Sequence, residues 1–174
     1  MSKLYVNEIY AKGSSTKALE IDSSGRILMP ARPSFHVRLD TATSGQNYTS
    51  MSDCPFDTID HEVGDCIAIS SDVATFTAPI AGVYHFSLTV GFDAVGSATW
   101  LSTFLFLNGA TVNGSDEESY RVLTDVPSAD YVALTSSNTI QLASGDTINP
   151  KIKVNTDTSV GIRVSTRFSG FLVG

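Results

Sequence analysis

Histidine, the commonest catalytic base, occurs three times in this chain of 174 residues, as His36, His61 and His85. The three lie far apart in the sequence, and none has the His-Glu-x-x-His spacing of a zinc site. The sequence also lacks a Gly-x-Ser-x-Gly elbow, a phosphate-binding Walker loop and a Gly-x-Gly-x-x-Gly fingerprint. Glycosidases need two opposed carboxylates in a cleft, whereas the acidic residues here fall in predicted turns. No catalytic residue is predicted, and we expect that the chain is not an enzyme.

Carboxylates could instead hold a cation. Calcium takes six to eight oxygen ligands, and two acidic groups are candidates for supplying them. The first is Asp116, Glu117 and Glu118; the second is Asp57, Asp60, Glu62 and Asp65. Neither matches an EF-hand loop, and a solvated acidic surface explains both equally well. Calcium is the only cofactor for which the sequence offers ligands.

Cys54 and Cys66 are the only cysteines. A zinc site needs four ligands at short local spacings, so these two do not make one. A single disulfide bridge between them and two free thiols in a reducing compartment are both compatible with the sequence.

The charge distribution excludes some partners. The net charge is −7, and the stretch from Leu39 to Tyr120 carries eleven Asp and Glu but no Lys or Arg. Nucleic acids and anionic membranes attract basic surfaces, so neither is an expected partner. The N-terminus has no apolar run typical of a signal peptide, and no stretch is long enough to span a membrane. We therefore expect synthesis in a cytoplasm, without secretion or membrane insertion.

Strand signals dominate the sequence, and helical periodicity is nearly absent. Apolar or alternating runs recur every 8–14 residues or so between Gly, Ser, Asn and Asp clusters, a pattern typical of β-sandwiches and barrels. The predicted strands are 34–40, 67–70, 74–77, 82–90, 99–107, 131–135, 139–142, 147–154 and 161–172. Asn108-Gly109 predicts a tight hairpin, as does Ser144-Gly145-Asp146. Residues 113–128 are predicted to form a surface loop.

Segment 99–107 is almost continuously apolar, with Trp100, Phe104 and Phe106 among its side chains. A strand with one solvated face alternates, so a nearly continuous run predicts that both faces are covered. The C-terminal run that contains Phe168 and Phe171 has the same character. Since one sandwich has one core, these runs predict contact between subunits.

The first 31 residues differ from the rest. Short alternating pieces around residues 4–10, 18–22 and 26–29 end at Pro30 and Pro33, and they are too short to bury a core alone. We predict an appendage over residues 1–31 that acquires order through partners, and a folded domain over residues 32–174. The anchoring residues predicted in the appendage are Leu4, Val6, Ile9, Leu19, Ile21 and Ile27.

Three ordered blocks carry a resemblance. Residues 74–88 read Ala-Thr-Phe-Thr-Ala-Pro-Ile-Ala-Gly-Val-Tyr-His-Phe-Ser-Leu, residues 105–109 read Leu-Phe-Leu-Asn-Gly, and residues 140–148 are followed by Thr-Arg-Phe-Ser-Gly-Phe-Leu at 166–172. Together with Arg-Pro-Ser-Phe at 32–35, they resemble the C1q domain of the C1q/tumour-necrosis-factor superfamily. The resemblance covers residues 32–174. It implies an all-β jelly roll of about ten strands, a homotrimer, binding without catalysis, and in many members calcium near the trimer apex.

The aromatic residues of these blocks are assigned to the core or the trimer interface. They are Phe76, Tyr84, Phe86, Trp100, Phe104, Phe106, Phe168 and Phe171. No collagen-like Gly-X-Y repeat precedes the domain, so another element must form the stalk.

Residues 2–9, 18–27 and 30–35 resemble the opening of tailed-phage appendage proteins, in which short β segments lead into a trimeric tip. That resemblance implies a virion protein, made in the host cytoplasm and attached to capsid or tail proteins through residues 1–31. Two roles fit: a tail or head fibre tip that recognises a glycan or protein on the host surface, and a capsid-decorating knob. The alternative is a cellular C1q/TNF-like lectin or ligand-binding module.

Overall fold

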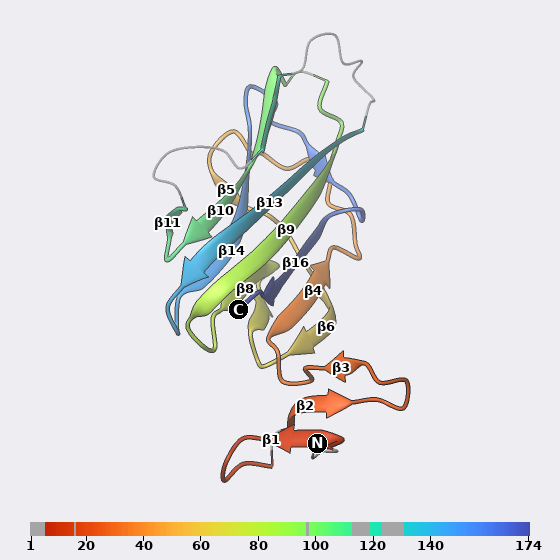
Figure 1. The fold of residues 1–174 in the computed structure, drawn as a ribbon. Coiled ribbons are helices and arrows are strands. Elements are labelled where there is room, and N and C mark those ends of the chain that lie inside the picture. Colours follow the sequence, from red (N-terminus) through yellow and green to blue (C-terminus); the bar gives the residue numbers. More distant parts are fainter. Residues whose placement is uncertain (1–5, 16, 97, 113–118, 123–130) are drawn as a thin grey trace.

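The computed structural model describes residues 6–15, 17–96, 98–112, 119–122 and 131–174. Every regular element in these ranges is a β-strand, which confirms the predicted all-β class (Figure 1). The described residues contain no helix that is long and apolar enough to cross a membrane. The strands form three sheets, two of which make a jelly-roll sandwich.

The first sheet of the sandwich has six strands. Its order is β13 (Val132–Leu142), β9 (Gly82–Asp93), β16 (Arg167–Leu172), β4 (Ser34–Arg38) and β6 (Thr58–Val63), and β15 (Gly161–Ile162) pairs with β9. All of these pairings are antiparallel.

The second sheet has seven strands. Its order is β11 (Ala110–Thr111), β10 (Trp100–Leu107), β14 (Thr147–Val154), β8 (Val73–Thr77) and β7 (Ile67–Ser70), with β12 (Ser119–Val122) beside β10 and β5 (Ser52–Asp53) beside β14. The two sheets enclose the core, because alternate side chains of each strand point inward.

Two tight turns follow the predicted chemistry. Asn108 and Gly109 adopt φ values of 50° and 83° between β10 and β11, and Gly145 adopts 91° between β13 and β14. Left-handed backbone is cheap for Gly and tolerated by Asn, so these residues allow the chain to reverse tightly. The Asn108-Gly109 hairpin is confirmed, because β10 and β11 pair. The turn predicted at Ser144-Gly145-Asp146 is present, but it is not a hairpin: β13 and β14 belong to different sheets, so this turn carries the chain from one sheet to the other.

The prediction erred most at β13, which is one strand of 11 residues rather than two pieces. The polar run Ser136-Ser137-Asn138 reads like a turn, but it pairs with Phe86, Ser87 and Leu88 of the long strand β9. Short strands β5, β6, β11 and β12 were not predicted as separate strands, and 161–172 is two strands. Pairing with a long neighbour outweighs local propensity in such segments.

The appendage forms the third sheet. It consists of β1 (Glu8–Tyr10), β2 (Lys17–Ile21) and β3 (Ile27–Leu28), and it lies at the end of the sandwich where the C-terminus also lies (Figure 1). Lys17 Nζ joins its strands through ion pairs to Glu8 at 2.6 Å and Glu20 at 2.9 Å. Within the described residues, every buried hydrophobic side chain lies at Phe35 or later, so the appendage adds nothing to the core.

Candidate functional site

Four of the predicted aromatic residues form the centre of the core. Phe76, Tyr84, Phe86 and Phe168 are at most 1% exposed within the single chain. The ring of Phe86 lies 5.1 Å from that of Phe76 and 5.9 Å from that of Phe168. The Tyr84 hydroxyl donates a hydrogen bond to the Ile80 carbonyl at 2.8 Å, so its polar end is satisfied. These residues stabilise the sandwich and offer no surface to a partner.

The aromatic residues on the outward face of β10 are covered to different degrees. Phe104 is only 4% exposed, whereas Trp100 and Phe106 are half-buried. Lys153 Nζ lies 5.4 Å from the Trp100 ring centre, and Lys151 Nζ lies 5.5 Å from that of Phe106. The nearly continuous apolar run therefore has covering groups within one chain, and it does not by itself require a sister copy.

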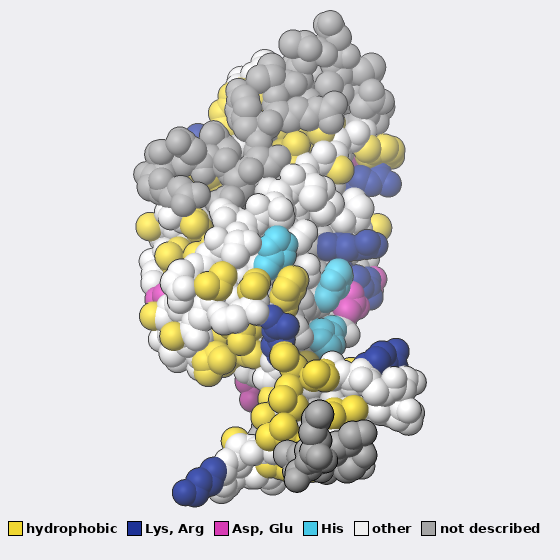
Figure 2. Space-filling model, in the orientation of Figure 1, with side chains coloured by type: hydrophobic (Ala, Val, Ile, Leu, Met, Phe, Trp, Pro, Cys, Tyr) yellow, Lys and Arg dark blue, Asp and Glu magenta, His cyan; other side chains and the backbone are white. Residues whose placement is uncertain are grey.

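Phe171 behaves differently. It is 46% exposed on the outward side of β16, the sheet face turned toward the viewer in Figure 2. Side chains alternate along strands, so the register of β13, β9, β16 and β4 aligns their outward residues in rows. We call this surface the open face.

Three rows of the open face follow from the pairing. The first row is Thr139, His85, Phe171 and Ser34; the second is Ser137, Ser87, Ser169 and His36; the third is Thr135, Thr89, Arg167 and Arg38. The first two rows contain no Lys, Arg, Asp or Glu. They are a band of hydroxyl, imidazole and phenyl groups across four strands.

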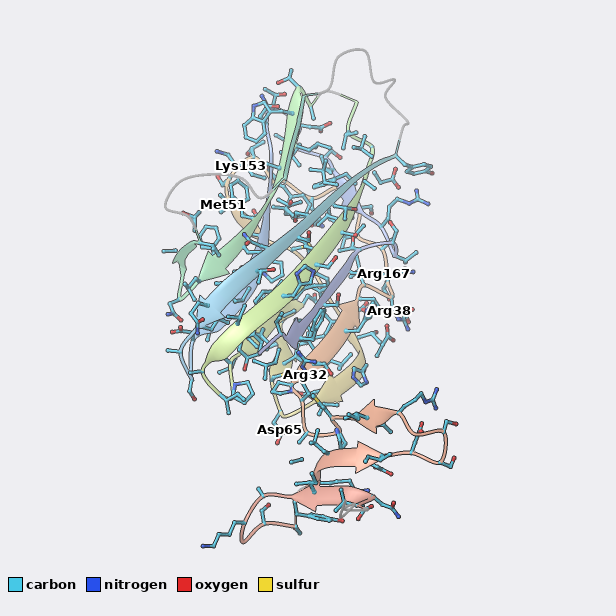
Figure 3. All side chains as sticks on the ribbon, viewed as in Figure 1. Arg32, Arg38, Met51, Asp65, Lys153 and Arg167 are labelled. Atoms are coloured by element: carbon cyan, nitrogen blue, oxygen red, sulfur yellow. The ribbon has the colours of Figure 1, made fainter. Side chains whose placement is uncertain are left out.

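Formal charge begins in the third row, at the edge where Figure 3 places Arg167 and Arg38. The Arg38 guanidinium donates to Asp40 and to Asp60 Oδ1, the latter at 2.9 Å, and these hydrogen bonds raise the pKa of Arg38. His36 Nε2 lies 3.7 Å from the other oxygen of Asp60. The charged groups thus form a rim along β4 and β6 beside an uncharged band.

All three histidines lie on the open face, which their separation in the sequence does not predict (Figure 2). His36 is paired in register with His61 of β6, whose Nε2 lies 3.1 Å from the Ser34 hydroxyl. His85 Nδ1 lies 3.1 Å from the Thr139 hydroxyl, and its ring centre is 5.4 Å from that of Phe171. A signal existed: His36 and His85 each stand between buried aromatic or aliphatic neighbours, which marks them as outward residues.

Ser34 and His61 have the residue types of the serine and histidine in a hydrolase triad, but no carboxylate accompanies them among the described residues. A catalytic imidazole needs a carboxylate on its second nitrogen to fix its tautomer and stabilise its charge. Within the described residues, His61 forms no hydrogen bond or ion pair with a carboxylate, and Asp60 faces His36 and Arg38 instead. The pair therefore has the geometry of a surface hydrogen bond.

The acidic groups have other partners or lie elsewhere. Asp116, Glu117 and Glu118 fall outside the described residues. Asp57 accepts the backbone N–H groups of Asp40 and Thr41; burial raises the pKa of its carboxyl, but these hydrogen bonds outweigh it and the pKa is lowered. Glu62 accepts the N–H of Ile67 at 3.0 Å. Within the described residues, no three His, Cys, Asp or Glu side chains converge as metal ligands.

Cys54 and Cys66 are buried free thiols, which decides between the two alternatives that the sequence left open. Burial raises the pKa of both, that of Cys66 to about 11. A thiol that stays protonated is a poor nucleophile and a poor metal ligand, so both cysteines act as small core residues.

Five of the six predicted anchoring residues are among the described residues of the appendage, and their anchoring role stays a prediction. Leu4 is not described, Leu19 is half-buried, and the other four are exposed: Val6, Ile9, Ile21 and Ile27. A second apolar surface lies where the appendage meets the sandwich. There, a hollow of about 380 Å³ is lined by Met29, Ile80 and Val173 among others, and hydrophobic side chains gather across this junction in Figure 2.

No protein-family model matches the sequence, and no curated protein matches it either. Solved structures do match in fold. The globular domain of zebrafish complement 1qA protein has a TM-score of 0.59 at 17% identity, with 82% of this chain and 98% of that chain covered. Murine APRIL at pH 5.0 gives 0.56 at 17% identity, with coverages of 82% and 99%. The Eiger TNF structure from S. frugiperda gives 0.55 at 11% identity, with 83% and 94% covered. The sandwich therefore has a C1q/TNF-like jelly-roll fold.

Proposed function

We propose that the chain is a non-enzymatic binding and assembly module that works as a homotrimer, with the open face as the contact between copies. The observation that carries this proposal is the uncharged band of the first two rows. A solvated antiparallel face normally carries charged side chains, because these keep it soluble and prevent association. Here eight aligned positions carry none, and the exposed ring of Phe171 stands among them.

The chemistry of the band suits a closely fitted protein partner. Ser and Thr side chains are short, so a second surface can approach the sheet, and half-exposed aromatic residues are typical interface anchors. The band also continues into the apolar junction at Ile80 and Val173, which are 50% and 47% exposed. A ring of three copies buries one such surface per copy without leaving an open end.

Sedimentation equilibrium at pH 8 tests this proposal, with a mass of three chains as the expected result. Phe171→Glu places a charge in the uncharged band and should raise the chain concentration needed for assembly by at least about thirtyfold, as expected for an interface anchor. Met51→Glu is the matched control, since Met51 is also exposed but lies beside β5 of the other sheet. A wild-type chain that remains monomeric, or equal effects of both variants, would contradict the assignment.

The finer part of the proposal concerns the appendage. Its three short strands leave Val6, Ile9, Ile21 and Ile27 exposed, and such a small sheet is marginal alone. We assign it the role of attaching the trimer to a phage virion, through capsid or tail proteins. The support is this exposed apolar surface together with the resemblance of residues 2–9, 18–27 and 30–35 to phage appendage proteins.

The attached domain acts either as a fibre tip that contacts a host-surface glycan or protein, or as a capsid-decorating knob. Mass spectrometry of purified virions from a lysing host should find the chain in a copy number divisible by three. Immunogold labelling then separates the roles, since a tip labels the fibre end and a decoration labels the shell. Absence from virions would favour a cellular binding module instead.

A further inference from the structure

The uncharged band of the open face can gain charge only through its histidines. Its first two rows contain no Lys, Arg, Asp or Glu, and their only ionisable side chains are His85 and His36. His61 adjoins both rows, through its register partner His36 and its contact with Ser34. The chain has three histidines in all, so every one of them lies on this face.

His85 occupies the centre of the band. The side chains that surround it are uncharged: Thr139 from β13, Phe171 from β16, and Val83 and Ser87 along its own strand β9. Within the described residues it forms no ion pair. The charged groups beside the band are the cations Arg167 and Arg38 in the third row and the carboxylates of Asp40 and Asp60, and the ion pair of Asp93 with Arg163 lies farther along β9.

Of the other two histidines, His36 lies beside a carboxylate and His61 lies on the edge strand β6. Asp60 faces His36 at 3.7 Å, but it already accepts a hydrogen bond from Arg38. His61 contacts the Ser34 hydroxyl. Arg32, which donates to the Val173 carbonyl, adds a third cation at the lower edge of the face, where Figure 3 labels it. A proton taken up by His36 therefore meets partial compensation, whereas one taken up by His85 meets none.

We infer that assembly through the open face is proton-sensitive, with His85 as the principal sensor: the copies associate while His85 is neutral and separate when it is protonated. This inference rests on the proposed trimer. A charge enclosed in an interface without a counter-charge is costly, and the cost falls on the assembled form only. An ordinary imidazole takes up its proton near pH 6.5, so the contact is complete above about pH 7 and weakens as the pH falls toward 5.5.

The size of the effect follows from linkage. If only chains with a neutral His85 assemble, each pH unit below about 6.5 lowers the assembly constant about tenfold for each His85 in the interface. Three copies contribute three such groups, so the chain concentration needed for half-assembly should rise at least about tenfold between pH 8 and pH 5.5. Ordinary carboxyl groups titrate at about pH 4, below this range, so the test attributes the change to the histidines.

The test is sedimentation velocity of the full chain at pH 8, 7, 6 and 5.5 and constant ionic strength, with circular dichroism to verify the fold. We expect trimers at pH 8 that dissociate reversibly toward pH 5.5. His85→Gln keeps a polar side chain that cannot take up a proton and should remain assembled at pH 5.5. His61→Gln is the matched control and should dissociate like the wild type.

The outcomes are distinguishable. A wild-type trimer with the same stability at pH 8 and pH 5.5 overturns this inference but leaves the proposed trimer intact. A monomer at pH 8 overturns the proposed function itself. If His85→Gln destroys the fold, His85→Asn replaces it. Retained acid dissociation in a folded His85 variant overturns the assignment to His85.

Discussion

Buried threonine hydroxyls in this fold occur in two opposite states. Thr103 and Thr166 are both fully buried, but the Thr166 hydroxyl accepts the Gly91 N–H at 3.1 Å while the Thr103 hydroxyl has no hydrogen-bond partner in the described part of the chain. A buried hydroxyl without a hydrogen-bond partner loses its hydrogen bonds to water and gains none in the protein, which costs free energy. Thr103 is therefore a local weakness in strand β10.

Thr103→Val should stabilise the protein by about 1 kcal/mol, because it replaces the unpaired hydroxyl with a methyl group of the same shape. Urea unfolding at a fixed chain concentration measures the change. Thr166→Val is the matched control and should destabilise by about 1 kcal/mol or more, since it leaves the Gly91 N–H without its acceptor. Loss of stability in Thr103→Val would mean that the hydroxyl does find a partner.

For single residues, the sequence predicts burial well where the alternation of side chains along a strand decides which face a residue lies on. The alternation around Tyr84 and Phe86 predicts buried rings, and both are buried. Parity also marks His85 as outward. It does not reveal that His85, His36 and His61 share one face, because that depends on which strands become neighbours, and the order β9, β16, β4 and β6 is set by distant segments.

Two turns that are far apart in the sequence contact each other in the fold. Asp146 joins two of them: its carboxylate accepts the Asn108 side-chain N–H at 2.8 Å and the Ala143 backbone N–H at 2.7 Å. Asn108 in turn accepts the Thr147 N–H at 2.9 Å. The β10–β11 hairpin and the β13–β14 turn are thereby held together by residues whose motifs each looked purely local.

These hydrogen bonds make the stability of the turns dependent on pH. The hydrogen bond from the Asn108 side chain, together with the hydrogen bond from the Ala143 backbone, lowers the pKa of the Asp146 carboxyl. A depressed folded-state pKa gives stability that is present above the unfolded value of about 3.9 and lost as the pH falls through the folded value. Asp146→Asn should therefore destabilise the protein at pH 7, and its difference from wild type should shrink toward pH 2.5.

Urea unfolding at both pH values measures that difference. Asp65→Asn is the control, because Asp65 is exposed and forms no hydrogen bond or ion pair through its side chain within the described chain. Equal differences at pH 7 and pH 2.5 for Asp146→Asn would contradict the role given to its ionised form.

Strand prediction succeeded and failed for related reasons. Strands such as β10, which is mostly apolar, and β14, which alternates, were found from the sequence because these patterns mark a strand whichever strand it pairs with. The middle of β13 was missed because Ser136, Ser137 and Asn138 favour a turn locally, and only the length of β9 holds them in the ladder. The two-residue strands β5 and β11 carry too little sequence to signal anything by themselves.

For the whole molecule, the sandwich and the appendage differ in what they contribute to folding stability. The sandwich contains every buried hydrophobic side chain of the described residues, while the appendage exposes most of its own. Folding therefore depends on residues 32–174, and the open face that we propose for assembly lies there as well. Attachment is the role that we propose for the first 31 residues.

Removing residues 1–31 should accordingly leave a folded trimer that no longer binds the virion. The truncation keeps Arg32 and its contact with the Val173 carbonyl, and it removes no core residue, so the melting temperature should change by only a few degrees. Sedimentation measures the trimer, and co-sedimentation with virions that lack the chain measures attachment.

The full-length variant Ile9→Ser/Ile27→Ser keeps the appendage backbone but removes two exposed apolar side chains, and it should also lose attachment. A monomeric truncated chain would show that the appendage does the trimerising, and normal attachment by the truncated chain would place the anchor within the sandwich.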